Sequence, residues 1–229
     1  MHTKELKSVL RQLSLEDIHV IDISISRNDY MPIDLSKANT ALDTIDISSS
    51  RAWQTFILNS LNKQNKIVAY GGYLEKRALY NRSSYFINQN FETDRNIHLG
   101  LDLWTAAGTS VLAAVPGKIH SFKDNTNFGD YGPTVILEHQ LHGLKFYTLY
   151  GHLSRASLTH LNIGAKVGQG EVIAHLGTAA VNGDYAPHLH FQIIKDLQSN
   201  VGDYPGVCSL RDLEFYKNNT FNPEIILGL

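Results

Sequence analysis

The feature that most constrains the fold is a series of short β-branched and aromatic segments, separated by glycine-containing turns, that begins after residue 108. The segments are 109–115, 133–139, 144–150, 171–176 and 188–194. Short strand-forming runs at this spacing, without helical patterns between them, are typical of an antiparallel sheet or sandwich rather than of βαβ units. The sequence therefore predicts a mainly β fold.

The first part of the chain has a different pattern. Residues 3–14 place apolar side chains at helical spacing, and residues 18–25 alternate apolar and polar side chains as a strand does. Residues 48–50 are serines that offer N-caps to a second amphipathic helix. We therefore expect an N-terminal α/β appendage over residues 1–95 and a β domain with a C-terminal extension over residues 96–229.

Composition excludes several classes of function. Hydrophobic residues make up 43% of the chain, enough for a sizeable core, and a net charge of -2 leaves no basic field to hold nucleic acid. Cys208 is the only cysteine, so an intrachain disulfide and a thiolate metal site are both excluded. The N-terminus lacks the pattern of a secretory signal and no apolar run suffices for a membrane span, so we expect a cytoplasmic protein. The oligomeric state is left open.

Histidine is the residue type that points to chemistry. The chain holds 11 histidines against one cysteine, which favours a metal site with nitrogen and oxygen ligands. Seven of them lie between residues 139 and 190: His139, His142, His152, His160, His175, His188 and His190.

Two His-x-x-x-Asp pairs occur, His98 with Asp102 and His120 with Asp124. Around the first pair, polar and apolar residues alternate as in a strand, which places His98, Gly100 and Asp102 on one face. A side chain at position 100 would project between the two ligands, so the glycine lets both approach one ion. The second pair runs into a polar turn, so only the first pair is a candidate for metal ligands.

Two further motifs place histidines at the ends of strands. Pro187-His-Leu-His-Phe191 is the only His-x-His in the chain, and strand periodicity points His188 and His190 to the same face. Tyr150-Gly-His-Leu-Ser154 puts His152 beside a glycine at the end of an aromatic strand. Taken alone, each motif is also compatible with ordinary core or surface histidines.

Taken together, these motifs resemble the lysostaphin-type, or LytM-like, zinc metallopeptidases, which are peptidoglycan endopeptidases. The order His98-x-x-x-Asp102, Gly108-Thr-x-Val111, Tyr150-Gly-His and Pro187-His-Leu-His carries the resemblance. It implies one zinc ion per chain, bound by His98, Asp102 and His190, with water or substrate in the fourth position. It also implies that His152 and His188 are catalytic histidines beside the metal, in a groove across a small antiparallel sheet.

The chemistry of this ligand set fits a hydrolase. Two neutral imidazoles and one carboxylate leave a zinc site with net positive charge and an open position, whereas a structural site would have a fourth protein ligand. Zinc lowers the pKa of its water from ~15.7 towards ~7. No Glu follows the metal histidines as in His-Glu-x-x-His, so His152 and His188 are the available acid and base. The sequence leaves open which of the two takes which role.

The chain departs from the usual family pattern around the proposed groove. The loop before Pro187 is different, which places Asp184 and Tyr185 near the substrate, and Gln192 follows the second histidine motif. The flanks, including Tyr70-Gly-Gly-Tyr73, resemble a branch that is fused to phosphotransferase and aminotransferase domains in some large proteins.

Residues 66–95 have two readings. They either pack on the sheet or lie across the groove with Glu75 or Asn81 on the zinc. A cationic and aromatic set in this segment could also pair with a substrate carboxylate: Arg77, Tyr80 and Arg82.

Three functions therefore remain open. The first is a zinc metallo-endopeptidase for peptidoglycan-like fragments or short glycine- or D-amino-acid-containing peptides. The second is a cytosolic zinc amidohydrolase acting on a small metabolite, and the third is a non-catalytic regulator with the peptidase fold. None of the three needs a nucleic acid or a membrane span.

Overall fold

The computed structural model describes residues 2–13, 17–83, 86–87, 90 and 92–229. Its α-helices are α1 His2–Leu13, α2 Ser50–Gln64, α3 Leu213–Asn219 and α4 Glu224–Leu227. The first strands are β1 Tyr30–Pro32, β2 Val68–Gly71, β3 Ile97–His98, β4 Leu101–Trp104, β5 Ser110–Leu112 and β6 Gly117–Asn125. The others are β7 Gly132–Leu141, β8 Leu144–Gly151, β9 Lys166–Val167, β10 Val172–His175, β11 His188–Ile194, β12 Val207–Cys208 and β13 Thr220–Phe221.

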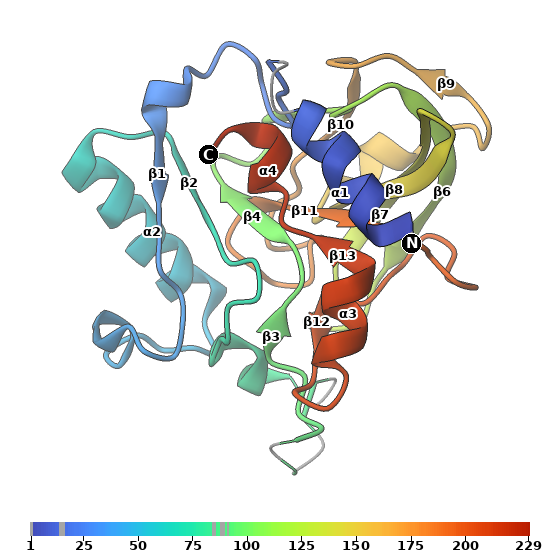
Figure 1. The fold of residues 1–229 in the computed structure, drawn as a ribbon. Helices are drawn as coiled ribbons and strands as arrows, with labels where there is room; N and C mark the ends of the chain where they lie inside the picture. Colours follow the sequence, from blue (N-terminus) through green and yellow to red (C-terminus); the bar gives the residue numbers. More distant parts are fainter. Residues whose placement is uncertain (1, 14–16, 84–85, 88–89, 91) are drawn as a thin grey trace.

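One large sheet organises the molecule (Figure 1). Its strands follow the order β1-β2-β4-β11-β8-β7-β6-β9, with β13 pairing with β11, and all described pairings except β1 with β2 are antiparallel. Strands β5 and β10 form a second, small antiparallel sheet, and β3 pairs with β12. The expected mainly β architecture is confirmed.

The two faces of the central strands differ in chemistry because side chains alternate along a strand. Leu101, Leu103 and Leu189 point into the main hydrophobic core. Helices α1 and α4 contact one another and add their apolar residues to this core, so the first and last helices of the chain pack side by side (Figure 1). Asp102 and His190 alternate with the leucines and therefore occupy the opposite face.

The N-terminal segment extends the sheet. β1 pairs with β2, and β2 pairs with β4, so both strands lie on the sheet edge next to the histidine motifs. Helix α2 covers this edge with Trp53, Ile57 and Leu61, and it is capped by Ser49, whose hydroxyl accepts a hydrogen bond from the Ala52 amide. The boundary near residue 95 stays a proposal, and strands from both sides of it share the sheet.

Two local predictions are wrong. Residues 18–25 do not form a strand: a single bridge joins Ile21 to Val111, and the Asp22 carboxylate then accepts a hydrogen bond from the Ser24 amide, which turns the chain away. The strand expected across residues 98–103 is interrupted between β3 and β4, at Leu99 and Gly100.

The described residues contain no helix with the length and apolar character that a membrane span requires.

Candidate metal centre

Three buried side chains meet at the edge where β3, β4 and β11 come together. Asp102 of β4 and His190 of β11 are directly opposite one another in the antiparallel register, and His98 lies at the end of β3. The Nε2 atom of His98 is 2.9 Å from Nδ1 of His190 and 3.2 Å from Oδ1 of Asp102, while His190 Nδ1 is 3.0 Å from that same oxygen. All three residues are at most 2% exposed.

The outer hydrogen bonds of the two imidazoles assign their tautomers. His98 donates from Nδ1 to the carbonyl oxygen of Gly72 at 2.9 Å, and His190 donates from Nε2 to Oε1 of Gln192 at 3.3 Å. The inward nitrogens are therefore lone pairs. Three acceptor atoms then face one another, and with these tautomers none of them carries a proton to share.

Such a set of acceptors fits a cation. In a tetrahedral zinc site with bonds of 2.0–2.2 Å, neighbouring ligand atoms lie about 3.3–3.6 Å apart. The observed separations of 2.9–3.2 Å are a few tenths of an ångström shorter, so small movements would open the triangle to an ion. Among the described residues, these three form the group of potential ligand atoms close enough together to hold a metal.

The Asp102 carboxylate is fixed from its other side by Arg77. The Arg77 side chain is 2% exposed and donates from Nη1 to Oδ2 of Asp102, while its Nε donates to Oε2 of Glu75. Its guanidinium also lies over the Trp104 ring, 5.4 Å from the centroid. Burial alone would raise the pKa of Asp102, but the buried groups around it, the positively charged Arg77 among them, outweigh burial and hold the pKa of this carboxyl well below its usual range. Oδ1 therefore remains ionised and free to bind a metal.

Two glycines leave the space that the closely packed side chains of Arg77, His98 and His190 need. A Cβ at Gly72 would lie 1.9 Å from Nη2 of Arg77 and 2.9 Å from Nδ1 of His98, and Gly72 has a φ of +110°. A Cβ at Gly100 would lie 2.6 Å from Cε1 of His190. The sequence-based expectation that position 100 must be empty agrees with this contact.

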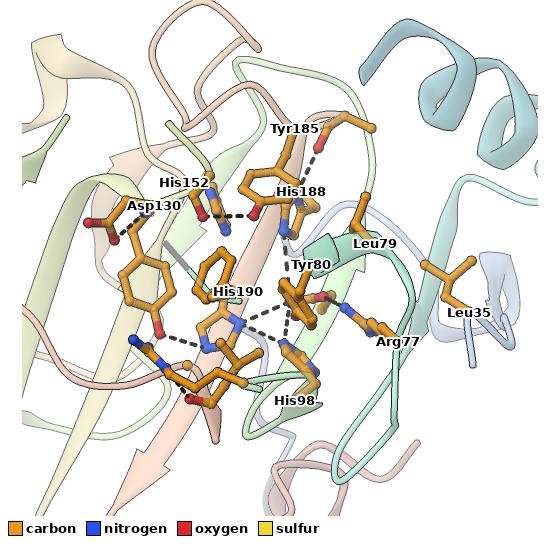
Figure 2. A pocket seen from close by; sticks show the side chains of 18 of the residues that line it. Leu35, Arg77, Leu79, Tyr80, His98, Asp130, His152, Tyr185, His188 and His190 are labelled. Carbon is orange, nitrogen blue, oxygen red and sulfur yellow. Dashed lines mark hydrogen bonds and ion pairs between the residues drawn. The ribbon is translucent and has the colours of Figure 1, made fainter. Parts of the chain in front are cut away.

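His152 and His188 lie side by side next to the three acceptors. Their ring centroids are 4.1 Å apart, and Nε2 of His188 is 3.8 Å from Oδ1 of Asp102. Figure 2 shows both rings facing the same space as His98 and His190. His152 follows β8, whose last residue pairs with His190, and it has a φ of +63° that turns its side chain into the site.

His152 and His188 are each oriented by a hydrogen bond from Nδ1 to a backbone carbonyl oxygen. His152 donates from Nδ1 to the carbonyl oxygen of Asn182 at 2.8 Å, and His188 donates from Nδ1 to that of Ala186 at 2.7 Å. Each ring therefore keeps a lone pair at Nε2. Burial lowers the pKa of both, and the pKa of His152 is lowered further because two protonated rings as close as His152 and His188 would repel one another. Both are therefore neutral at pH 7.

The centre is enclosed. It borders a cavity of about 240 Å³, and His152 and His188 are each 5% exposed. Tyr185 packs edge-on against His152 at 5.1 Å and donates its hydroxyl to the Gly129 carbonyl oxygen. Tyr80, in the 3-10 helix Leu79–Arg82, lies in front of the histidines (Figure 2).

The segment over the centre does not present the metal ligands considered from the sequence. Glu75 is engaged by Arg77 and by the Leu35 amide, and Asn81 is exposed. Arg82 has a buried side chain that donates to Asp184 and lies between aromatic rings, so it braces the loop before Pro187.

The rejected His120 and Asp124 pair is not a site. His120 contacts Ser121 and Tyr147, and Asp124 accepts a hydrogen bond from Arg155. Sequence reasoning missed the Arg77 contact with Asp102, because the two residues lie 25 positions apart and no local pattern indicates it.

Residues 96–201 match the sequence profile of peptidase family M23. The match covers 106 of the 229 residues. The match contains His98, Asp102, His152, His188 and His190, so the expected lysostaphin-type resemblance is confirmed, and with it the assignment to metallopeptidase hydrolases. No match was found among the curated proteins.

Solved structures of peptidases resemble parts of the chain. The catalytic domain of lysostaphin from Staphylococcus simulans is 27% identical, with 53% of this chain and 80% of that chain covered and a TM-score of 0.37. An M23-type peptidase from Pseudomonas aeruginosa is 22% identical over 75% of this chain and 60% of that chain, with a TM-score of 0.39. A zinc-containing peptidase from Vibrio cholerae is 24% identical over 53% and 34%, with a TM-score of 0.36. This chain therefore spans less than two thirds of the length of the Pseudomonas aeruginosa and Vibrio cholerae proteins.

Proposed function

We propose that this M23 chain is a zinc-dependent hydrolase that cleaves an amide bond in short peptides. His98, Asp102 and His190 would hold one zinc ion per chain through Nε2, Oδ1 and Nδ1. When bound, the ion supplies a Lewis acid for the substrate carbonyl and an acidified water as nucleophile. The observation that carries the proposal is the triangle of three buried acceptor atoms facing two further imidazoles with free Nε2 atoms.

His152 and His188 would move the protons of the reaction. Each holds its Nδ1 proton on a backbone carbonyl, so each presents a proton acceptor at Nε2. One imidazole accepts a proton from the attacking water, and the protonated ring can then donate it to the leaving amine. The two adjacent rings share this duty, with His188 next to Asp102.

Arg77 and the enclosing segment would set the conditions for this chemistry. Arg77 keeps Asp102 ionised and oriented, and Tyr80 and Tyr185 limit the water that reaches the centre.

The experiment is cleavage of short peptides and muropeptides by zinc-loaded protein, followed by mass spectrometry. His152→Ala should lower kcat by about 10²- to 10⁴-fold, the usual contribution of a positioned acid or base. His175→Ala is the matched control because His175 is exposed on β10. Absence of cleavage by zinc-loaded protein, or full activity of His152→Ala, would contradict the proposal.

A second candidate, an amidohydrolase for a small metabolite, is favoured by the size of the cavity. Its volume of about 240 Å³ lies below the usual ~300–1,000 Å³ of ligand pockets. Cleavage of small amides without cleavage of any peptide would select this candidate. Cleavage of intact muropeptides would select peptidoglycan-like substrates.

A further inference from the structure

One end of the cavity beside the metal centre is apolar. The side chains lining it are Leu35, Trp53, Ile57, Leu79, Trp104 and Ala186. All of them are buried and belong to one hydrophobic cluster, which is separate from the main core beneath the sheet. Four of them, Leu35, Trp53, Ile57 and Leu79, precede the segment that matches the M23 family. The N-terminal part of the chain therefore supplies most of this wall, and Trp104 and Ala186 complete it.

The apolar end is continuous with the catalytic histidines. Trp104 stacks on the His188 ring, with centroids 5.7 Å apart and an interplanar angle of 23°. Ala186 supplies the carbonyl oxygen that orients the same histidine. A substrate whose amide lies at the metal centre would thus place a neighbouring side chain between Trp104 and α2.

A chain of polar contacts fixes the distance between this wall and the metal ligands. The Leu35 amide donates to Oε1 of Glu75 at 3.0 Å, Oε2 of Glu75 accepts from Arg77, and Arg77 holds Asp102. The apolar wall and the carboxylate ligand are therefore parts of one rigid arrangement, as a specificity pocket requires.

We propose that the apolar end of the cavity is a binding subsite for a large aliphatic or aromatic side chain next to the scissile amide. This inference rests on the proposed function and names its substrate class. A glycine or alanine at that position would leave the subsite empty, whereas a leucine or phenylalanine would fill it and release its water. The preference should reach about 10- to 200-fold, the range by which a hydrophobic pocket discriminates side chains.

The test uses two inert probes, N-acetyl-leucine hydroxamate and N-acetyl-glycine hydroxamate, which share a metal-binding group and differ only in the side chain. Trp53 and Trp104 are the two tryptophans of the chain, and both line the subsite. Tryptophan emission therefore reports occupancy without any need for catalysis. Titrations are made on the full chain, zinc-loaded and metal-free.

The variant Ile57→Phe fills the subsite, and Ile163→Phe is its matched control because Ile163 is 70% exposed. The leucine probe should bind about 10- to 200-fold more tightly than the glycine probe and change the emission. Ile57→Phe should bring this ratio close to one, and Ile163→Phe should keep it. If near-ultraviolet circular dichroism shows that Ile57→Phe is unfolded, Ala186→Val replaces it with the same expectation.

Equal affinities of the two probes, or a preference that survives in the filled variant, would overturn the subsite. These results are distinct from a failure of the proposed function. Selective binding without peptide cleavage would contradict the hydrolase and support the subsite. Cleavage of peptides regardless of side-chain size would support the hydrolase and contradict the subsite.

Discussion

Replacing Arg77 by Gln removes the guanidinium that holds the Asp102 carboxylate. Both side chains are buried, and Arg77 also pairs with Glu75. Two effects on metal binding oppose one another. Loss of a nearby positive charge reduces repulsion of a cation, which favours tighter binding. Loss of the positioning contact leaves Asp102 buried without its partner, so it takes up a proton and turns away from the metal, which weakens binding.

The magnitudes decide between these effects. A unit charge about 4 Å away is worth about 4 kcal/mol at an effective dielectric constant of 20, but the adjacent Glu75 carboxylate offsets most of the field of Arg77. Loss of a group that orients a metal ligand typically costs 10- to 100-fold in affinity, or about 1.4–2.8 kcal/mol. We therefore expect Arg77→Gln to bind zinc about 10- to 100-fold more weakly. The unfolding free energy of the metal-free protein should fall by about 3–5 kcal/mol, as for other broken buried ion pairs.

Competition with a chromophoric chelator measures the zinc affinity, and urea denaturation measures the stability. Arg155→Gln is the matched control because it breaks an arginine–aspartate pair that is largely exposed, with Asp124, and should cost at most about 1 kcal/mol. Arg77→Lys, which keeps the charge but not the planar fork, should fall between wild type and Arg77→Gln. Unchanged or tighter zinc binding by Arg77→Gln would refute the positioning role of Arg77.

Two further predictions follow from the same structure. Burial lowers the pKa of His139 to about 4, against a smaller opposing effect of its hydrogen bond to the Pro116 carbonyl oxygen. Because the unfolded chain then binds more protons, the stability due to neutral His139 is present above pH ~6.5 and is lost as the pH falls towards 4, by up to about 3 kcal/mol. In urea denaturation across this pH range, the unfolding free energy of His139→Gln should fall less steeply with decreasing pH than that of the wild type. An equally steep fall in the variant would contradict the assigned role of neutral His139. Gly72→Ala should lower zinc affinity because its Cβ would collide with Arg77, whereas Gly143→Ala, where the structure leaves open space, should retain affinity despite its positive φ. Equal zinc affinities of the two glycine variants, measured by chelator competition, would contradict the steric conflict expected between a side chain at position 72 and Arg77.

Strand periodicity accounts for what the sequence could predict. The alternation in residues 188–194 predicted a strand, and β11 spans these same residues. Alternation predicts separately that Asp102 shares a face with His98 and that His190 shares a face with His188. The pairing of β4 with β11 then places Asp102 directly opposite His190. Motif order supplied His152, which periodicity alone could not distinguish from a surface histidine.

The remainder depends on tertiary contacts. Ile23 alternates as a strand residue would, yet it is 66% exposed because the preceding Asp22 forms a local turn. Arg77 lies 25 positions from Asp102 in the sequence, and no local pattern encodes that such an arginine is buried. The apolar wall likewise exists only because β1 and β2 join the sheet next to β4.

The central claim is that His98, Asp102 and His190 bind one catalytic zinc ion. The most direct test is the metal content of protein purified without added metal, measured by inductively coupled plasma mass spectrometry beside Asp102→Asn. This substitution keeps the size of the side chain and an oxygen for Arg77 but removes the charge. We predict about one zinc per chain in the wild-type protein and its loss in folded Asp102→Asn. Wild-type protein without zinc, or zinc retained at the same stoichiometry by Asp102→Asn, would contradict the assignment.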